Sequence, residues 1–136
     1  MKRTYVDAGV LIAAARGNGK LAAKALAVIA DTASRSFVCS DYVKLEVIPK
    51  PTYLGRTAEV SFYEGFFSTV STWLPFNVDD LEQALTEACA AGLSAVDAIH
   101  VVVAANSGCE ELVTSEKTTS AIHRTTLVHV TSIDVE

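Results

Sequence analysis

The chain has 136 residues, which is close to the usual length of one domain. Hydrophobic residues make up 50% of the sequence and charged residues 20%, which excludes a largely disordered chain and predicts a single domain over residues 1–136. The net charge of −5 argues against indiscriminate binding to polyphosphates, because that binding rewards clustered lysine and arginine. It does not exclude an enzyme that acts on nucleic acid.

No apolar run approaches the roughly 20 residues that a membrane-spanning helix needs; residues 101–105 are a typical example. The first residues show no apolar signal segment followed by a cleavage site. Cys39, Cys89 and Cys109 are too widely spaced for a zinc site or a disulfide scaffold. We therefore expect a cytoplasmic protein, without a membrane segment, whose cysteines are reduced, buried thiols.

The first half of the chain alternates between strand and helix patterns. The predicted elements are a strand at 4–6, helices at 10–15 and 20–33, a strand at 37–39 and a helix at 42–48. The apolar face of the second helix consists of Leu21, Ala25, Val28 and Ile29. Ser40 or Asp41 is placed to cap the third helix, and Pro49 and Pro51 are expected to stop it.

The second half continues the alternation. The predicted elements are an aromatic-rich helix at 57–74, a strand at 76–78, a helix ending at Ala91–Gly92, a helix that Ser94 opens and that spans 95–106, and strands at 111–114 and 127–130. Asp79 or Asp80 is expected to cap the helix after residue 78, with Glu82 or Gln83 completing a capping box. The aromatic residues of 57–74 favour core or dimer packing over a surface that stacks on nucleic-acid bases. The order of elements predicts an α/β fold with three layers, α/β/α, around a mainly parallel sheet of four to five strands.

Four acidic residues close separate apolar stretches: Asp7, Glu46, Asp97 and Glu116. If the strands are parallel, their carboxyl ends share one edge of the sheet, so these side chains can converge there. Mg²⁺ prefers oxygen ligands, and a cation among carboxylates can activate water and neutralise charge on a phosphate ester. Taken singly, Asp97 is explained as a first-turn acid stabilised by the helix dipole and Glu46 as a solvated helix residue. Together, the four acids predict one site for divalent cations and phosphate esters.

These residues resemble the PIN domain, the nuclease fold of many toxin ribonucleases. The resemblance rests on Asp7 after the leading strand, Glu46 in a helix after the second strand, and residues 93–100 and 112–116. It covers essentially the whole chain. It implies catalytic acids that bind Mg²⁺ or Mn²⁺ and support hydrolysis of single-stranded RNA.

Carried over by position, Asp7 and Asp97 are the primary metal ligands. Glu46 is a ligand or a residue that orients water, and Glu116 is an outer acid or a ligand of a second ion. The resemblance also implies a small antitoxin partner and a homodimer formed through the aromatic-rich helix.

Two features depart from the family pattern. Ala8 and Gly9 stand where the family commonly has serine or threonine soon after the first aspartate, and Glu116 stands where it usually has aspartate. A second hypothesis is therefore a catalytically weak PIN module that binds RNA or protein without cleavage. A phosphatase of another aspartate-dependent family is disfavoured, because Gly9 rather than a second aspartate follows two residues after Asp7.

Other polar residues have two interpretations each. His100 lies three residues after Asp97 on a similar helical face, so it is either a metal ligand or general base, or a packing and hydrogen-bonding residue. Thr114 can hydrogen bond to a carboxylate or phosphate, or simply cap its turn. Five basic residues are candidates for gripping the RNA backbone or are solvated charges: Lys20, Lys24, Lys44, Lys117 and Arg124.

Overall fold

The structure is a computed structural model that describes residues 1–135. Its sheet has five strands, all paired in parallel, in the order β3-β2-β1-β4-β5. The strands are β1 (Lys2–Val6), β2 (Arg35–Ser40), β3 (Thr72–Leu74), β4 (Glu111–Thr114) and β5 (Val130–Ser132). The predicted α/β class with a parallel sheet is confirmed.

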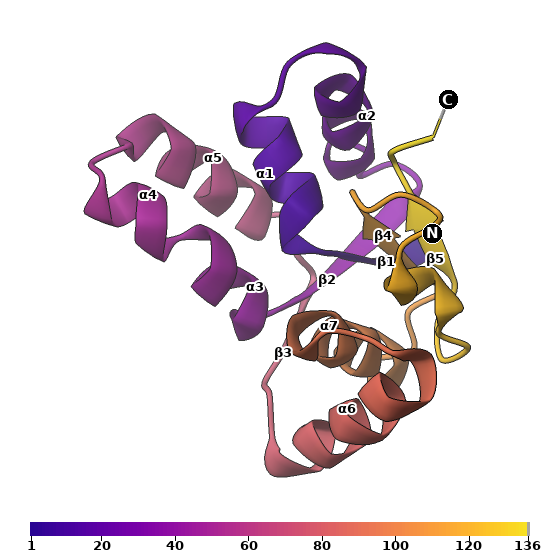
Figure 1. The fold of residues 1–136 in the computed structure, drawn as a ribbon. Helices are drawn as coiled ribbons and strands as arrows, with labels where there is room; N and C mark the ends of the chain where they lie inside the picture. The colour runs from indigo at the N-terminus through magenta and orange to yellow at the C-terminus, as the bar shows by residue number, and fades with distance from the viewer. Residues whose placement is uncertain (136) are drawn as a thin grey trace.

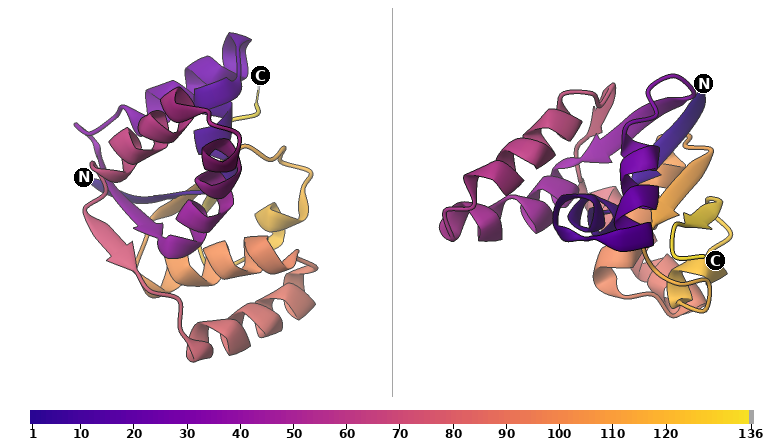
Figure 2. Two further views of the ribbon diagram at one scale, coloured as in Figure 1. Left: turned by 90° about the vertical axis from the view of Figure 1, so that its left-hand side faces the viewer. Right: turned by 90° about the horizontal axis from the view of Figure 1, so that it is seen from above.

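Helices connect the strands and cover both faces of the sheet. They are α1 (Ala8–Arg16), α2 (Gly19–Ile29), α3 (Asp41–Val47), α4 (Pro49–Tyr53), α5 (Thr57–Phe67), α6 (Val78–Ala91), α7 (Ala95–Asn106) and the 3-10 turn η1 (Ala121–Arg124). Figure 1 shows α1, α2 and α5 on one side of the sheet and α6 and α7 on the other. The left view of Figure 2 shows the same separation, so the three layers predicted from the sequence are present.

The strand order reverses direction at the central strand β1. From β1 it proceeds to β2 and β3 on one side, and it then returns to add β4 and β5 on the other. Val6 pairs with Val113, and the Asp7 N–H continues the ladder by donating to the Val113 carbonyl at 3.1 Å. In open parallel sheets such a switch point, at the carboxyl ends of the strands, is where ligands bind.

Helix ends follow local capping rules. Ser94 caps α7 and Gly92 ends α6 with φ of 69°, as expected from the sequence. The cap of α6 was predicted wrongly. Asn77 caps that helix, and Asp80 completes the capping box in place of Glu82 or Gln83, so the predicted strand at 76–78 is also wrong.

The predicted aromatic-rich helix at 57–74 is wrong beyond Phe67. The helix ends there, and residues 72–74 form the edge strand β3, in which Trp73 pairs with Cys39. Aromatic residues suit a strand as well as a helix, so pairing with β2 decides the outcome. Pro49 ends α3 as predicted, but it is also the first residue of α4. At that position a backbone N–H makes no hydrogen bond within the helix, so proline is tolerated there.

Two further expectations need correction. The last strand lies at Val130–Ser132 rather than 127–130, because its pairing places Leu112 opposite Val130. The helix predicted at 20–33 ends at Ile29, and its buried residues are Ala22, Ala25 and Ile29, whereas Leu21 is 36% exposed. Small residues on the buried face let α2 approach α1 closely, which the hydrophobic pattern alone does not indicate.

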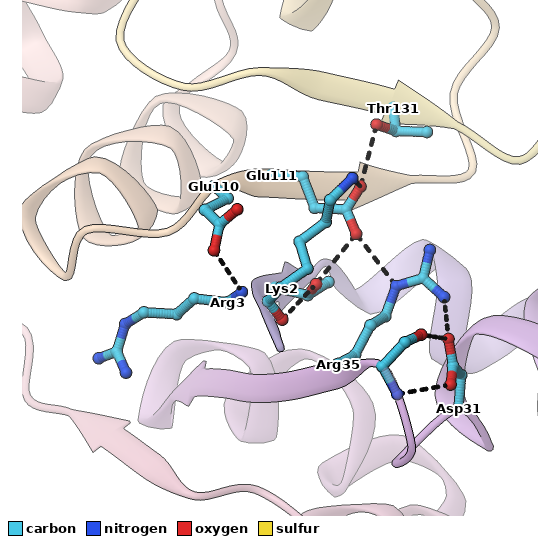
Figure 3. A network of polar contacts seen from close by, with 9 residues as sticks. Lys2, Arg3, Asp31, Arg35, Glu110, Glu111 and Thr131 are labelled. Atoms are coloured by element: carbon cyan, nitrogen blue, oxygen red, sulfur yellow. Dashed lines mark hydrogen bonds and ion pairs between the residues drawn. The ribbon is translucent and has the colours of Figure 1, made fainter.

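A buried carboxylate ties together the amino ends of three strands. Glu111, at the start of β4, is 2% exposed and accepts hydrogen bonds from Thr4 Oγ1 at 2.9 Å and Arg35 Nε at 3.0 Å. Arg35 also bonds Asp31, and Lys2 Nζ lies 3.7 Å from Glu111 (Figure 3). Burial tends to raise the pKa of Glu111, but the bonds from Arg35 and Thr4 outweigh it and lower that pKa. This network lies at the edge of the sheet opposite to the carboxyl ends.

No single helix within residues 1–135 is long and apolar enough to span a membrane. One pair, Val78–Ala91 with Ala95–Asn106, meets the length and composition criteria together, but it is bent by 115° at its break.

Candidate active site

All four acids predicted as site residues line one cavity of about 190 Å³. Its remaining lining residues are Ala8, Gly9, Val96, His100 and Ser115. Asp7 follows β1 and Glu116 follows β4, so two of the acids come from the two strands that flank the switch point. The cavity therefore lies where the topology of the sheet predicts a ligand site.

Asp7 is fixed by its role as the N-cap of α1. Its Oδ1 accepts a hydrogen bond from the Val10 N–H at 3.2 Å, and its side chain is nearly enclosed, with 6% exposure. Burial raises the pKa of Asp7 above its ordinary value, while hydrogen bonding by Thr114 and the Val10 N–H opposes that rise. The charge of His100 also opposes the rise, but burial outweighs these contributions.

Asp97 and Glu46 approach the cavity from two helices on different sides of the sheet. Asp97 lies in the first turn of α7, where its N–H donates to the Ser94 hydroxyl at 3.2 Å. Glu46 lies in α3, and its side chain is 27% exposed. Both carboxylates are more open to solvent than Asp7, so they form the outer part of the cavity.

Glu116 follows β4, and its backbone is held by the last strand. The Glu116 carbonyl accepts from the Ser132 hydroxyl at 2.5 Å, and its N–H donates to Thr114 Oγ1 at 3.1 Å. Its Oε2 is buried and has no hydrogen-bond partner within residues 1–135. Burial raises the pKa of Glu116, followed by the charge of Asp97, a side-chain hydrogen bond with Asp97, and the charge of Asp7. Among the residues that the structure describes, Glu116 Oε2 is thus the buried side-chain oxygen that lacks a hydrogen-bond partner.

His100 is engaged through both of its ring nitrogens. The ring is 1% exposed; Nε2 lies 2.5 Å from Glu46 Oε1, and Nδ1 lies 2.7 Å from the Tyr5 hydroxyl, which is 2.9 Å from Ser40 Oγ. Burial raises the pKa of Tyr5 well above its ordinary value, so the phenol keeps its proton. The interpretation of His100 as a hydrogen-bonding residue is supported, because neither nitrogen is left to bind a metal.

The donor set suits a hard divalent cation. Carboxylate oxygens are the ligands that Mg²⁺ and Mn²⁺ favour, and Mg²⁺ keeps several waters, each of about 30 Å³ in the liquid. A cavity of about 190 Å³ has room for a partly hydrated ion. Within residues 1–135, however, no three His, Cys, Asp or Glu side chains are close enough to form a ready-made metal cluster.

Several basic residues proposed for RNA contact have structural partners. Lys44 Nζ lies 4.4 Å from the centre of the Trp73 ring, Lys24 donates to the Val135 carbonyl, and Arg124 Nε donates to the Ala91 carbonyl at 2.7 Å. Lys117 follows Glu116 directly and is exposed. Of the five basic residues, Lys117 is thus the nearest to the cavity along the chain.

The aromatic residues of α5 belong to the protein's own core. Tyr63, Phe66 and Phe67 are buried, and Phe66 packs edge-on against Phe37 with ring centres 5.2 Å apart. These rings are therefore not available for stacking on bases.

The cysteines do not form a reactive centre. Cys39 is buried, and burial raises its pKa to about 12. Cys109 is partly buried and has a raised pKa for the same reason, whereas Cys89 is exposed, so the expectation that all three are buried is wrong.

Three residues next to the site were not identified from the sequence. Tyr5 and Ser40 support His100, and Ser115 lines the cavity. A phenol in the middle of an apolar strand was a signal for Tyr5, because a buried Tyr hydroxyl needs a partner. Ser40 and Ser115 carry no comparable signal.

The comparisons with known proteins agree with this geometry. The PIN domain family model matches residues 4–124. VapBC2 from Rickettsia felis, in a structure bound to a promoter DNA fragment, has a TM-score of 0.71 at 14% identity, covering 96% of this chain and 98% of that chain. VapC20 from Mycobacterium tuberculosis, a toxin that cleaves the sarcin–ricin loop, has a TM-score of 0.62 at 21% identity, covering 80% and 86%.

FitAcB from Neisseria gonorrhoeae has a TM-score of 0.67 at 17% identity, covering 96% of this chain and 97% of that chain. No curated protein sequence matches significantly. At these identities the structural matches establish the fold, and the family model covers most of the sequence. The chain belongs to the PIN domain family.

Proposed function

We propose that this protein is a Mg²⁺- or Mn²⁺-dependent ribonuclease that cleaves single-stranded RNA and acts as the toxin of a toxin–antitoxin pair. The main supporting observation is Glu116 Oε2, a buried carboxylate oxygen without a partner among residues 1–135, in a cavity lined by three further acids. A buried charge of this kind is costly unless a proton or a cation neutralises it. PIN domains are generally nucleases, which favours the cation.

The position of each of the four acids suggests its role in binding the cation or orienting water. Asp7 and Asp97 would hold the cation, Glu46 would bind it or orient water, and Glu116 would act as an outer acid or bind a second ion. When bound, a divalent cation supplies charge that offsets the negative phosphodiester and eases deprotonation of the attacking water. The chain itself holds the donors in place, through the α1 cap for Asp7 and through His100 for Glu46.

The structural neighbours support the choice of substrate and partner. VapC20 is described as a toxin that cleaves the sarcin–ricin loop, which favours RNA, and the VapBC and FitAcB structures favour an antitoxin partner. Such a toxin would act in the cytoplasm, and we propose that it works as a homodimer.

The test uses purified protein with Mn²⁺. Isothermal titration calorimetry should show saturable binding, and labelled single-stranded RNA should be cleaved. Asp7→Asn and Asp97→Asn should abolish cleavage and relieve growth arrest on overexpression. Asp79→Asn, at an exposed position in the first turn of α6, is the matched control and should behave like the parent. Absence of both cleavage and growth arrest in the parent would exclude the ribonuclease.

The alternative is a PIN module that binds RNA or protein without cleavage. It is motivated by Ala8 and Gly9, and by the lack of a ready-made three-residue metal cluster within residues 1–135. Calorimetry separates the two functions: the module predicts no Mn²⁺ binding that depends on Asp7, and the nuclease requires it.

A further inference from the structure

Gly9, in the first turn of α1, is explained by a close neighbour rather than by its backbone. Four glycines have positive φ: Gly19, Gly55, Gly92 and Gly108. Gly9 is not among them, so its backbone conformation is open to any residue. A Cβ at position 9 would instead collide with Ser115 Oγ and lie 3.3 Å from Ser115 Cβ. Glycine therefore leaves open the space that the Ser115 side chain fills.

The Ser115 side chain lies in the acidic cavity beside Gly9. Ser115 lines the cavity, and the same Cβ position at residue 9 would be 3.4 Å from Asp7 Oδ1. The neighbouring residues are held in place, since Thr114 Oγ1 accepts from the Glu116 N–H and the Glu116 carbonyl accepts from Ser132. No comparable bond restrains the Ser115 side chain within residues 1–135. Its hydroxyl is thus positioned by its backbone but free to donate.

The other lining side chains offer no free donor. The four carboxylates only accept when ionised, and Ala8, Gly9 and Val96 have no polar side-chain group. His100 has both nitrogens engaged, with Tyr5 and with Glu46. Among the lining residues, Ser115 therefore supplies the one side-chain donor without a partner within residues 1–135. A phosphate oxygen entering this cavity needs a donor as well as a cation.

We infer that the Ser115 hydroxyl is a positioning group that donates a hydrogen bond to a phosphodiester oxygen of the substrate, and that Gly9 is required to make room for it. This inference rests on the proposed nuclease function. It assigns Ser115 to the binding of the phosphate rather than of the cation. The consequence is a loss of RNA affinity without loss of Mn²⁺ affinity when the hydroxyl is removed.

The experiment compares the parent with Ser115→Ala and two double variants of the full chain. G9S/S115A returns a hydroxyl to the cavity from the opposite side, and G9A/S115A is its control with the same backbone substitution but no hydroxyl. Three measurements are made on each: Mn²⁺ affinity by calorimetry, binding of fluorescein-labelled single-stranded RNA by anisotropy with Ca²⁺, and kcat and KM for cleavage with Mn²⁺. Circular dichroism confirms that each variant is folded.

Ser115→Ala should weaken RNA binding and raise KM by about 10-fold, the usual size for a hydrogen bond to a charged group, with Mn²⁺ affinity unchanged. G9S/S115A should recover part of that loss, and G9A/S115A should not. If the parent binds Mn²⁺ and cleaves RNA but Ser115→Ala matches it in RNA affinity and KM, the inference alone is wrong. Equal behaviour of the two double variants also contradicts it. A parent that neither binds Mn²⁺ nor cleaves RNA contradicts the nuclease function itself, and the inference with it.

Discussion

His100 holds Glu46 from inside the protein: the His100 Nε2 to Glu46 Oε1 distance is 2.5 Å, and the imidazole ring is 1% exposed. A carboxylate only accepts, so the proton of this bond belongs to Nε2. With a neutral ring, Nδ1 then accepts from the Tyr5 hydroxyl, which in turn accepts from Ser40. One carboxylate oxygen of Glu46 is thereby fixed, and the other is left for the cavity.

Substitution of His100 should separate its two hydrogen bonds. His100→Gln places an amide nitrogen near the position of Nε2 and keeps a donor for Glu46, but it leaves the buried Tyr5 hydroxyl without its acceptor. His100→Phe removes both bonds. Mn²⁺ affinity should fall by about 10- to 100-fold in His100→Phe, which is typical for the loss of a residue that orients a metal ligand, and much less in His100→Gln.

Both variants should lose about 0.5–1.5 kcal/mol of unfolding free energy, the usual net value of one hydrogen bond, because each removes the Nδ1 acceptor and leaves the buried Tyr5 hydroxyl with Ser40 alone. Urea denaturation measures that loss, and calorimetry measures the Mn²⁺ affinity. His129→Gln, at an exposed position, is the control. Equal Mn²⁺ affinities for His100→Gln and His100→Phe would show that His100 does not orient Glu46.

Asp7→Asn should stabilise the metal-free protein and remove its response to metal. Burial raises the pKa of Asp7, so in the folded state this acid binds protons more tightly than in the unfolded chain. Its contribution to stability therefore falls as pH rises from the unfolded pKa of about 3.9 through the folded pKa. Asparagine removes this charge and caps helices about as well as aspartate, so the α1 cap is preserved.

The measurement is thermal unfolding at pH 7 with and without Mn²⁺. Without metal, Asp7→Asn should melt above the parent. With Mn²⁺ at about 100 times its dissociation constant, the parent should gain about 2.7 kcal/mol and melt above the variant. Asp79→Asn should show the parent's response. A metal-free Asp7→Asn protein that melts below the parent would mean that the Asp7 charge is compensated in the fold.

The sequence predicts the layers and the parallel sheet because each strand is short, apolar and followed by a helix signal. The ends of α6 and α7 follow from Gly92 and Ser94, since caps act within one turn. The boundary between α5 and β3 could not be predicted this way. Trp73 fits either a helix or a strand, and its pairing with Cys39, 34 positions earlier, decides the matter.

The acidic residues of the site could also be predicted from the sequence, but the hydroxyl groups beside them could not. Asp7 and Glu116 follow predicted strands, and Glu46 and Asp97 lie in predicted helices, so the convergence of the four acids can be expected once the strands are taken as parallel. The Tyr5 hydroxyl contacts His100 in α7, and the Ser115 side chain lies beside Gly9 in α1. Such contacts depend on strand order, in which β1 lies next to β4, and no local pattern encodes that order.

Glu111 should make the free energy of unfolding depend on pH in the acid range. This residue lies at the end of the sheet opposite to the cavity. Burial tends to raise its pKa, but Arg35 and Thr4 outweigh it, so the folded pKa is lowered. A lowered pKa contributes stability above the unfolded value of about 4.3, and that contribution is lost as pH falls through the folded pKa. Glu111→Gln keeps an acceptor for Thr4 and removes the charge that Arg35 and Lys2 face.

At pH 7, Glu111→Gln should lose about 1.5–3 kcal/mol, the range for hydrogen bonds to charged groups, as measured by urea denaturation. The difference from the parent should shrink as pH falls from the unfolded value of about 4.3 through the lowered pKa of the folded Glu111. Glu110→Gln is the matched control. Glu110 precedes Glu111, is exposed, and accepts only a 3.3 Å hydrogen bond from the Arg3 N–H (Figure 3). A difference between parent and Glu111→Gln that is constant from pH 3 to 7 would show that the Glu111 charge does not stabilise the fold, and that the loss comes from altered packing alone.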